Sequence, residues 1–303
     1  MEKEKKITIN GNQLTLTNQS KLYWPKEGIT KGDVINYYQS VYAFIKKYLK
    51  DRPQSLRRNV NGIKDQGFFQ KDAGEGTPSW IKTSKILAES TNKKVEYIIC
   101  NDKATLTYMN NLGCIELNPW NSRTVSLNKP DYLIMDIDPS EKNTFEEVIE
   151  TALAIKEVLD KAGATSYCKT SGASGLHVYI PMHAAYTYEH VRSFAELIAH
   201  LTNEKLPKTT TLERPLKKRR GRIYIDYLQN SKGQTLASVY SLRPKPGATV
   251  SAPLLWKEVK KGLHPSQFTI HNMLARLKKS GDLFSGVLTD KTNLEKCIKN
   301  LGV

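Results

Sequence analysis

The chain has 303 residues, of which 39% are hydrophobic and 25% charged, a composition typical of a globular protein. Lysine and arginine outnumber aspartate and glutamate by 46 to 30, and the net charge of +16 favours nucleic acid or an anionic membrane surface as partner. No apolar run suits a signal peptide or a membrane span, and the four cysteines form no C-x-x-C pair. We therefore expect a cytoplasmic protein with reduced thiols and exclude the secreted, membrane-spanning and zinc-finger classes.

The N-terminal segment predicts a hairpin followed by a helix. Residues 7–16 form two alternating runs around Asn10 and Gly11, a dipeptide typical of a tight hairpin turn. Thr30, with Asp33 three residues later, is expected to cap a helix whose apolar positions continue to Leu49. Two short apolar segments, at 95–99 and 114–117, predict further strands.

The rest of the chain alternates predicted strands and helices. Strands are expected over 132–138, 176–180 and 222–228. Helices are expected from a Thr144–Glu147 capping box to Gly163 and over about 188–203, 266–279 and 292–301. Because the two kinds of element interleave, we predict a mixed α/β protein, α+β in stricter usage, with a sheet at its centre.

Three aspartates on predicted strands are the first candidates for chemistry. Asp136 and Asp138 lie two residues apart, so both side chains point to one face of the strand. Adjacent carboxylates repel each other unless a cation lies between them, and such oxygen ligands suit Mg²⁺ or Mn²⁺. Asp226, in the strand over 222–228, is a candidate third ligand. The alternatives are a solvated strand end for the first two and an ion pair with an arginine for Asp226.

An Asp-x-Asp pair after an apolar strand is also found in haloacid-dehalogenase phosphatases and metal-dependent glycosyltransferases. The phosphatase pattern has Thr or Val soon after the second aspartate and an acidic pair further on. Here Pro139 and Ser140 follow, and the chain has no Asp-Asp pair. The sequence therefore disfavours the phosphatase class.

A small-residue turn lies between the carboxylates. Residues 170–177, T-S-G-A-S-G-L-H, lead into a strand, and their backbone N–H groups, hydroxyls and imidazole suit a phosphate. The alternatives are an ordinary Gly/Ser turn and a structural role for His177.

Basic residues flank Asp226 in the sequence. They suit a triphosphate bound with metal ions, whereas the alternative is a solvated charged face. They are Lys217, Lys218, Arg219, Arg220, Arg222, Arg243 and Lys245. Together with the Asp-x-Asp pair and the small-residue turn, they indicate two-metal nucleotidyl transfer.

In these features the chain strongly resembles the polymerase domain of bacterial ligase D, a member of the archaeo-eukaryotic primase superfamily. The resemblance runs essentially end to end, and it is carried by KLYWP (21–25), GITKGD (28–33), GFFQK (67–71), LGCIELNPW (112–120), DIDP (136–139), TSGASGLH (170–177), RRGRIYIDYLQN (219–230) and YSLRPKPG (240–247). It implies a primase-like catalytic sheet with flanking helices and an N-terminal module packed against it. We expect one catalytic domain over 1–303, with subregions at 1–125, 126–250 and 251–303.

The resemblance also implies a nucleotidyltransferase that repairs double-strand breaks by non-homologous end joining. Such a polymerase adds nucleoside triphosphates to a primer on a template, at gaps, overhangs and broken ends that carry a 5′-phosphate. It prefers ribonucleotides and uses two divalent metal ions, Mn²⁺ in preference to Mg²⁺. The implied partners are Ku and a DNA ligase, in another domain or protein, with no membrane. The implied location is the cytoplasm, in association with the nucleoid.

Matched position by position, the resemblance implies three groups of site residues. The catalytic metal ligands are Asp136, Asp138 and Asp226. The residues that bind the incoming nucleotide are Asn118, Ser171, His177, Arg219, Gln229 and Arg243. The residues that contact DNA are Lys21, Lys31, Arg58, Phe68, Phe69 and Lys71. Lys21 and Lys31 match residues that hold the 5′-phosphate. Phe68 and Phe69 match aromatics that stack on template bases. Core packing is the alternative for the phenylalanines.

Two positions depart from the family pattern. Asn118 stands where the family commonly has His, and Ser174 stands where it commonly has Lys. Two other functional classes stay open at this point. One is a non-catalytic module that holds DNA ends, although three carboxylates facing a polyanion would weaken binding without metals. The other is a metal-dependent nuclease, which would shorten a primer rather than lengthen it.

Overall fold

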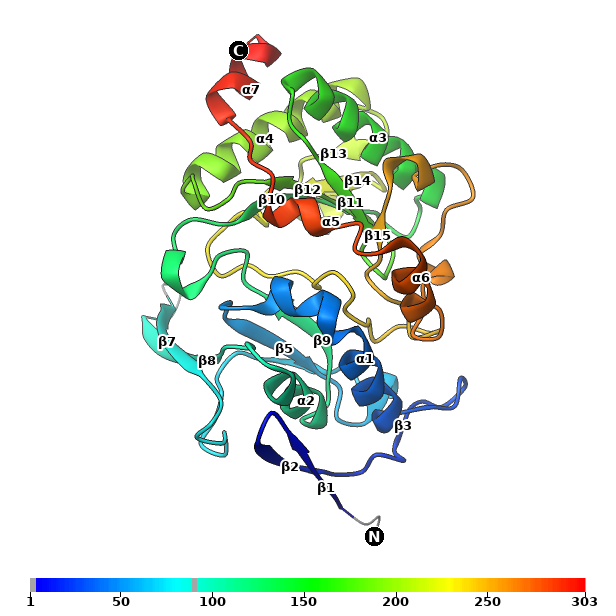
Figure 1. Cartoon of the computed structure of the whole chain (residues 1–303). Coiled ribbons are helices and arrows are strands. Elements are labelled where there is room, and N and C mark those ends of the chain that lie inside the picture. The colour runs from blue at the N-terminus through cyan, green and yellow to red at the C-terminus, as the bar shows by residue number, and fades with distance from the viewer. Residues whose placement is uncertain (1–3, 89–91, 303) are drawn as a thin grey trace. The chain divides into compact units, whose positions relative to one another are not determined.

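The structure is a computed structural model that describes residues 4–88 and 92–302 (Figure 1). The chain forms two compact units. Unit 1 comprises Met1–Val125, Thr235–Ser251 and Phe268–Lys279, and unit 2 comprises Ser126–Gln234, Ala252–Gln267 and Ser280–Val303. The single catalytic domain over 1–303 and its three subregions stay predictions.

The N-terminal hairpin of unit 1 forms as predicted. Strands β1 (Lys5–Ile9) and β2 (Asn12–Leu16) pair antiparallel. Asn10 and Gly11 between them have φ values of 52° and 79°. A two-residue turn of type I′ requires positive φ at both positions, which is why this dipeptide closes the hairpin.

Helix α1 (Lys31–Leu49) of unit 1 begins with the predicted capping box. Thr30 Oγ1 accepts from the Asp33 backbone N–H at 3.1 Å, and the Asp33 carboxylate accepts from the Thr30 N–H at 2.8 Å. Two orphan donors at the helix start are therefore satisfied. The buried side of α1 includes Val34, Val41 and Ile45.

The remaining elements of unit 1 form small sheets and two further helices. Strand β5 lies between β6 and β9 in an antiparallel sheet, while β3 pairs with β4 and β7 with β8. The bounds are β3 (Leu22–Trp24), β4 (Ile29–Thr30), β5 (Gln54–Arg58), β6 (Phe68–Gln70), β7 (Thr83–Ala88), β8 (Lys93–Ile98), α2 (Lys103–Asn111), β9 (Cys114–Pro119) and α6 (Met273–Ser280).

Unit 2 is built on a sheet with the strand order β13-β14-β10-β12-β11-β15. All neighbours pair antiparallel except β13 and β14, which are parallel. The bounds are β10 (Tyr132–Asp138), β11 (Tyr167–Thr170), β12 (Leu176–Pro181), β13 (Thr210–Thr211), β14 (Ile223–Asp226) and β15 (Pro253–Leu254). The central strand β10 has the predicted bounds.

Two helices cover one face of this sheet (Figure 1). Helices α3 (Phe145–Ala162) and α4 (Tyr188–Lys205) pack on β10 and β12. Met135 and Ile137 of β10 have no exposed surface. Since side chains alternate along a strand, Asp136 and Asp138 point to the other face. The shorter helices of unit 2 are α5 (Leu216–Arg219) and α7 (Leu294–Leu301).

Three predicted elements are shorter in the structure. The strand predicted over 222–228 ends at Asp226, because the Asp226 carboxylate accepts from the Leu228 backbone N–H at 2.9 Å and turns the chain. The helix predicted over 266–279 begins only at Met273, after a 3₁₀ turn at Pro265–Gln267. The helix predicted over 292–301 begins at Leu294, where Asn293 is the N-cap. None of the described helices is both long and apolar enough to cross a membrane.

Candidate active site

Four strands of unit 2 bring four polar residues into one row. Asp136 on β10 is paired with Asp226 on β14 and, on its other side, with His177 on β12. His177 is paired in turn with Lys169 on β11. Directly paired residues on neighbouring strands share a face, and Asp138 shares it too because it lies two residues from Asp136. The three predicted metal ligands therefore lie on one face of the sheet.

The two paired aspartates repel each other. Burial, together with the negative charge of Asp136, raises the pKa of Asp226 above its usual range. The Tyr224 hydroxyl donates to Oδ1 of Asp226 at 3.1 Å and partly offsets this rise. A bound cation would remove the repulsion, and carboxylate oxygens are the ligands that Mg²⁺ and Mn²⁺ prefer. The donor set of this face therefore fits a divalent metal.

Arg219 provides a positive charge at the third carboxylate. Its Nη1 donates to Oδ2 of Asp138 at 2.7 Å, and its guanidinium lies 4.3 Å from the centre of the Tyr224 ring. Within residues 4–88 and 92–302, no group of three or more His, Cys, Asp or Glu side chains is arranged to hold a metal ion. Arg219 thus engages one of the two carboxylate oxygens of Asp138.

His177 connects the carboxylates to a buried lysine that sequence reasoning missed. Nε2 of His177 lies 3.3 Å from Oδ1 of Asp136, and Nδ1 lies 2.8 Å from Nζ of Lys169. His177 is 2% exposed and Lys169 has no exposed surface. The signal in the sequence was weak, because a single lysine near a glycine-rich turn is more often a surface residue.

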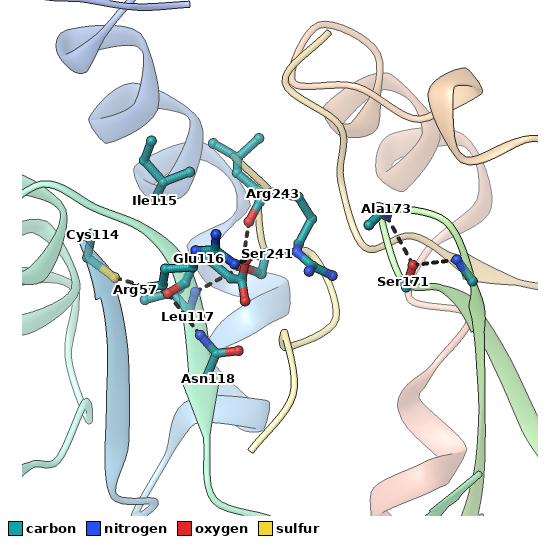
Figure 2. A network of polar contacts seen from close by, with 12 residues as sticks. Arg57, Cys114, Ile115, Glu116, Leu117, Asn118, Ser171, Ala173, Ser241 and Arg243 are labelled. Carbon is teal, nitrogen blue, oxygen red and sulfur yellow. Dashed lines mark hydrogen bonds and ion pairs between the residues drawn. The ribbon is translucent and has the colours of Figure 1, made fainter. Parts of the chain in front are cut away.

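The small-residue turn is closed by its own serine. The Ser171 hydroxyl accepts from the backbone N–H groups of Ala173 and Gly175, both at 3.0 Å, and Figure 2 shows these bonds as dashed lines. The sequence analysis left two interpretations of this turn open, N–H groups that suit a phosphate and an ordinary Gly/Ser turn. For the N–H groups of Ala173 and Gly175 the structure favours the second, because the serine hydroxyl already engages them.

The turn also packs against the strand of the carboxylates. A Cβ atom on Gly175 would lie 2.1 Å from the backbone oxygen of Ile137. Only glycine fits here, since the clash is with a backbone atom and not with the end of a flexible side chain.

We expect Gly175→Ala to lower the free energy of unfolding by about 3 kcal/mol, because the added methyl group overpacks two backbone segments. Chemical denaturation monitored by circular dichroism measures this loss. Gly76→Ala is the matched control, because a Cβ atom there meets nothing within 4 Å. Equal stabilities of the two variants would show that the turn adapts without cost.

Gln229 is a further candidate for contact with the nucleotide in unit 2. Oε1 of Gln229 is buried and has no hydrogen-bond partner among the described residues. A buried acceptor without a partner costs free energy, which a donor on a ligand would recover. Gln229 also donates its backbone N–H to Asp226.

In unit 1, a buried carboxylate lies between two arginines (Figure 2). Oε2 of Glu116 lies 2.9 Å from Nε of Arg243 and 3.7 Å from Nη1 of Arg57. Asn118, two residues further along β9, is 2% exposed and donates from Nδ2 to the Glu116 backbone oxygen at 3.3 Å. Arg243 and Asn118 were predicted from the resemblance, whereas Glu116 was not singled out.

Unit 1 also holds the predicted DNA contacts. Phe68 and Phe69 of the short strand β6 are 51% and 55% exposed, so core packing is excluded for them. The Arg58 guanidinium lies 5.3 Å from the Phe68 ring centre, and that of Arg57 lies 5.8 Å from Phe69. Lys71, which follows β6, is exposed.

The two lysines matched to the 5′-phosphate lie at the start of α1. The backbone N–H of Lys31 donates to the Lys21 oxygen at 2.9 Å. Nζ of Lys31 donates to the Thr17 backbone oxygen at 2.7 Å, and the residue is 4% exposed. Lys21 Nζ donates to the side-chain oxygen of Asn61.

The fold and sequence have clear relatives among known proteins. The polymerase domain from Mycobacterium tuberculosis ligase D, solved in complex with DNA, matches with a TM-score of 0.85 and 26% identity, covering 92% of this chain and 99% of that one. The predicted fold class is thereby confirmed, and with it the class of primase-type nucleotidyltransferases. The sequence model of the protein family described as LigD, primase-polymerase domain, matches residues 30–284, so the chain belongs to this family.

Curated relatives support the same assignment. The bifunctional non-homologous end joining protein LigD of Bacillus subtilis is 34% identical over 271 residues, which cover 89% of this chain and 43% of that protein. The multifunctional non-homologous end joining protein LigD of Mycolicibacterium smegmatis is 27% identical over 288 residues, 94% of this chain and 37% of that protein. The chain thus spans less than half the length of these relatives.

Proposed function

We propose that this chain transfers nucleotides to a primer 3′-hydroxyl, directed by a template, at gaps and broken ends during non-homologous end joining. The observation that carries the proposal is that Asp136, Asp138 and Asp226 share one face of the sheet. On this face the carboxylates of Asp136 and Asp226 repel each other. Membership of the primase-polymerase family supports the reaction type. The printed names of the relatives support the repair pathway.

The three aspartates would hold two divalent ions, Mn²⁺ in preference to Mg²⁺. When bound, such ions supply an activated 3′-hydroxyl and neutralise the triphosphate and its leaving group. Arg219 would contact the triphosphate, which guanidinium groups bind through paired hydrogen bonds.

We assign nucleotide contacts to the same six residues as the resemblance. In unit 2 they are Ser171, His177, Arg219 and Gln229, and the buried, unpartnered Oε1 of Gln229 favours a donor on the ligand. In unit 1 they are Asn118 and Arg243. An amide such as that of Asn118 both donates and accepts, which suits a ribose 2′-hydroxyl.

Primer extension on a gapped duplex tests the proposal. We expect primers to lengthen only with a divalent metal, to follow the template base, and to grow faster with ribonucleotides than with deoxyribonucleotides. Absence of extension with intact DNA binding would instead favour a non-catalytic end-binding module, and shortened primers would favour a nuclease. Equal rates with both sugars would contradict only the ribonucleotide preference.

Contacts with DNA are proposed for the exposed surface of unit 1. Phe68 and Phe69 would stack on template bases, because exposed aromatic rings offer a sequence-tolerant stacking surface. The nearby Arg58 and exposed Lys71 would contact phosphates. We further propose that the chain acts at the nucleoid together with Ku and a DNA ligase.

Recognition of a downstream 5′-phosphate is proposed for Lys21 and Lys31. Both residues meet at the N-terminus of α1, where the helix dipole favours an anion, and a terminal phosphate has more charge than an internal one. We expect wild-type protein to bind gapped DNA about tenfold more tightly when the 5′-phosphate is present. The Lys21→Ala/Lys31→Ala variant should lose this preference.

The control for this prediction removes the same number of positive charges from the other end of α1. Lys46 and Lys47 lie in the last turn of α1, so Lys46→Ala/Lys47→Ala should weaken binding to both DNAs alike. Fluorescence anisotropy at fixed salt measures all four affinities, and thermal unfolding confirms that each variant is folded. Equal losses on both DNAs in the Lys21→Ala/Lys31→Ala variant would mean that these lysines supply nonspecific charge only.

A further inference from the structure

Lys169 is a buried lysine for which the function proposed above has no role. It has no exposed surface, although an ammonium group is costly to bury unless it is bonded. Its Nζ lies 2.8 Å from Nδ1 of His177 and 5.5 Å from the centre of the Tyr179 ring. The lysine therefore ends the cross-strand row that leads through His177 to Asp136.

The bond from Lys169 determines which nitrogen of His177 carries the proton. An ammonium group has three donors and no acceptor, so Nδ1 of the imidazole must be the acceptor. In a neutral imidazole the proton then lies on Nε2, which is 3.3 Å from Oδ1 of Asp136. The opposite tautomer would turn a nitrogen lone pair toward the carboxylate oxygen, which is unfavourable.

We propose that Lys169 is a positioning residue that fixes the Nε2–H tautomer of His177 and, through it, the orientation of the Asp136 carboxylate. The inference rests on the proposed metal site, in which Asp136 is a ligand. An N–H donor that holds this carboxylate orients it before a metal ion binds. Partners of this kind behind a metal ligand typically change metal affinity by 10- to 100-fold. The strand register places all three side chains in one row, so the orientation is built into the sheet.

The first test needs only wild-type protein without metal. Histidine is labelled with ¹⁵N, and long-range ¹H–¹⁵N spectra at mildly alkaline pH report the tautomer of each ring. The His177 signals are assigned by their loss in His177→Gln. We expect the proton on Nε2 and an unprotonated Nδ1. A proton on Nδ1, or rapid exchange between both nitrogens, would overturn the inference.

The second test is the Lys169→Met variant, which keeps the length of the side chain and removes the donor. We expect the fixed Nε2–H tautomer to be lost and the dissociation constant for Mn²⁺ to rise about 10- to 100-fold, as measured by electron paramagnetic resonance. Lys169→Arg, which retains donors, should preserve the tautomer. The matched control is Lys156→Met, because Lys156 also lies beside a ring, 5.6 Å from the centre of Trp256, and pairs with a side chain in the same unit.

The outcomes separate this inference from the proposed function. A lysine that is merely structural would lower the melting temperature of Lys169→Met without changing the tautomer or Mn²⁺ affinity, and that result would overturn the inference. Failure of the wild type to bind Mn²⁺ would overturn the proposed metal site, whereas the tautomer measurement would still decide the role of Lys169. If Lys169→Met does not fold, the wild-type spectra alone decide it.

Discussion

Asp138→Ala is expected to slow primer extension by at least about a thousandfold while the protein stays folded and binds DNA. Loss of a metal ligand removes several kcal/mol of transition-state stabilisation, and each 1.36 kcal/mol is a factor of ten in rate. The Asp138 side chain is 47% exposed, so its removal leaves no buried cavity. Its removal also frees Arg219 from the ion pair, which favours DNA binding rather than weakening it. Single-turnover extension on a gapped duplex with Mn²⁺ measures the rate.

Asp160→Ala is the control for this substitution. Asp160 is also a partly exposed aspartate of unit 2 paired with a basic side chain, that of Lys156 on α3. It lies outside the row of carboxylates, so its removal should leave the rate within about twofold of wild type, since surface pairs contribute little. An Asp138→Ala protein that is folded and extends primers at a near-normal rate would contradict the metal assignment.

Glu116→Gln is expected to lower the free energy of unfolding by about 3 kcal/mol. Glu116 is 3% exposed and compensates the guanidinium groups of Arg57 and Arg243, and breaking a buried ion pair on one side costs about 3–5 kcal/mol. The low end applies because Arg57 retains 28% exposure. Glutamine keeps the shape of the side chain, so the loss reports the charge. Denaturant titration followed by fluorescence measures it.

The same variant should also raise the KM for nucleotides. Nε of Arg243 is held by Glu116, so the proposed nucleotide contact loses its fixed orientation when the carboxylate is replaced. Glu96→Gln is the matched control in unit 1, because Glu96 is 40% exposed and lies 4.0 Å from Lys85. We expect that control to cost less than about 1 kcal/mol and to leave KM unchanged. Equal effects of the two variants would mean that Glu116 does not stabilise or position the arginines.

Period-two alternation was sufficient to predict which face of the strand carries the two aspartates of the Asp-x-Asp pair. It placed Asp136 and Asp138 on one side of β10, and the predicted bounds of this strand match the structure. The pairing of Asp136 with both Asp226 and His177 was not predictable in this way. Register between strands far apart in the sequence depends on the whole fold, which a local pattern does not describe.

The features that sequence reasoning missed depend on long-range contacts. Lys169 lies beside His177 only because β11 pairs with β12 in this register. The N–H groups of Ala173 and Gly175 are engaged by the Ser171 hydroxyl, and these bonds depend on the exact turn geometry. For Phe68 and Phe69 the residue type alone left core packing open, and the structure excludes it because β6 is a three-residue edge strand that leaves both side chains exposed.

The central claim, that three aspartates of one sheet face hold two metal ions, is tested most directly by counting bound Mn²⁺. Equilibrium dialysis with a non-hydrolysable nucleoside triphosphate, followed by elemental analysis, gives the number of ions per chain. The account predicts two ions for wild type and for the Asp160→Asn control, and fewer for Asp136→Asn and Asp226→Asn. The same number of ions, bound with the same affinity, in all four folded proteins would contradict it.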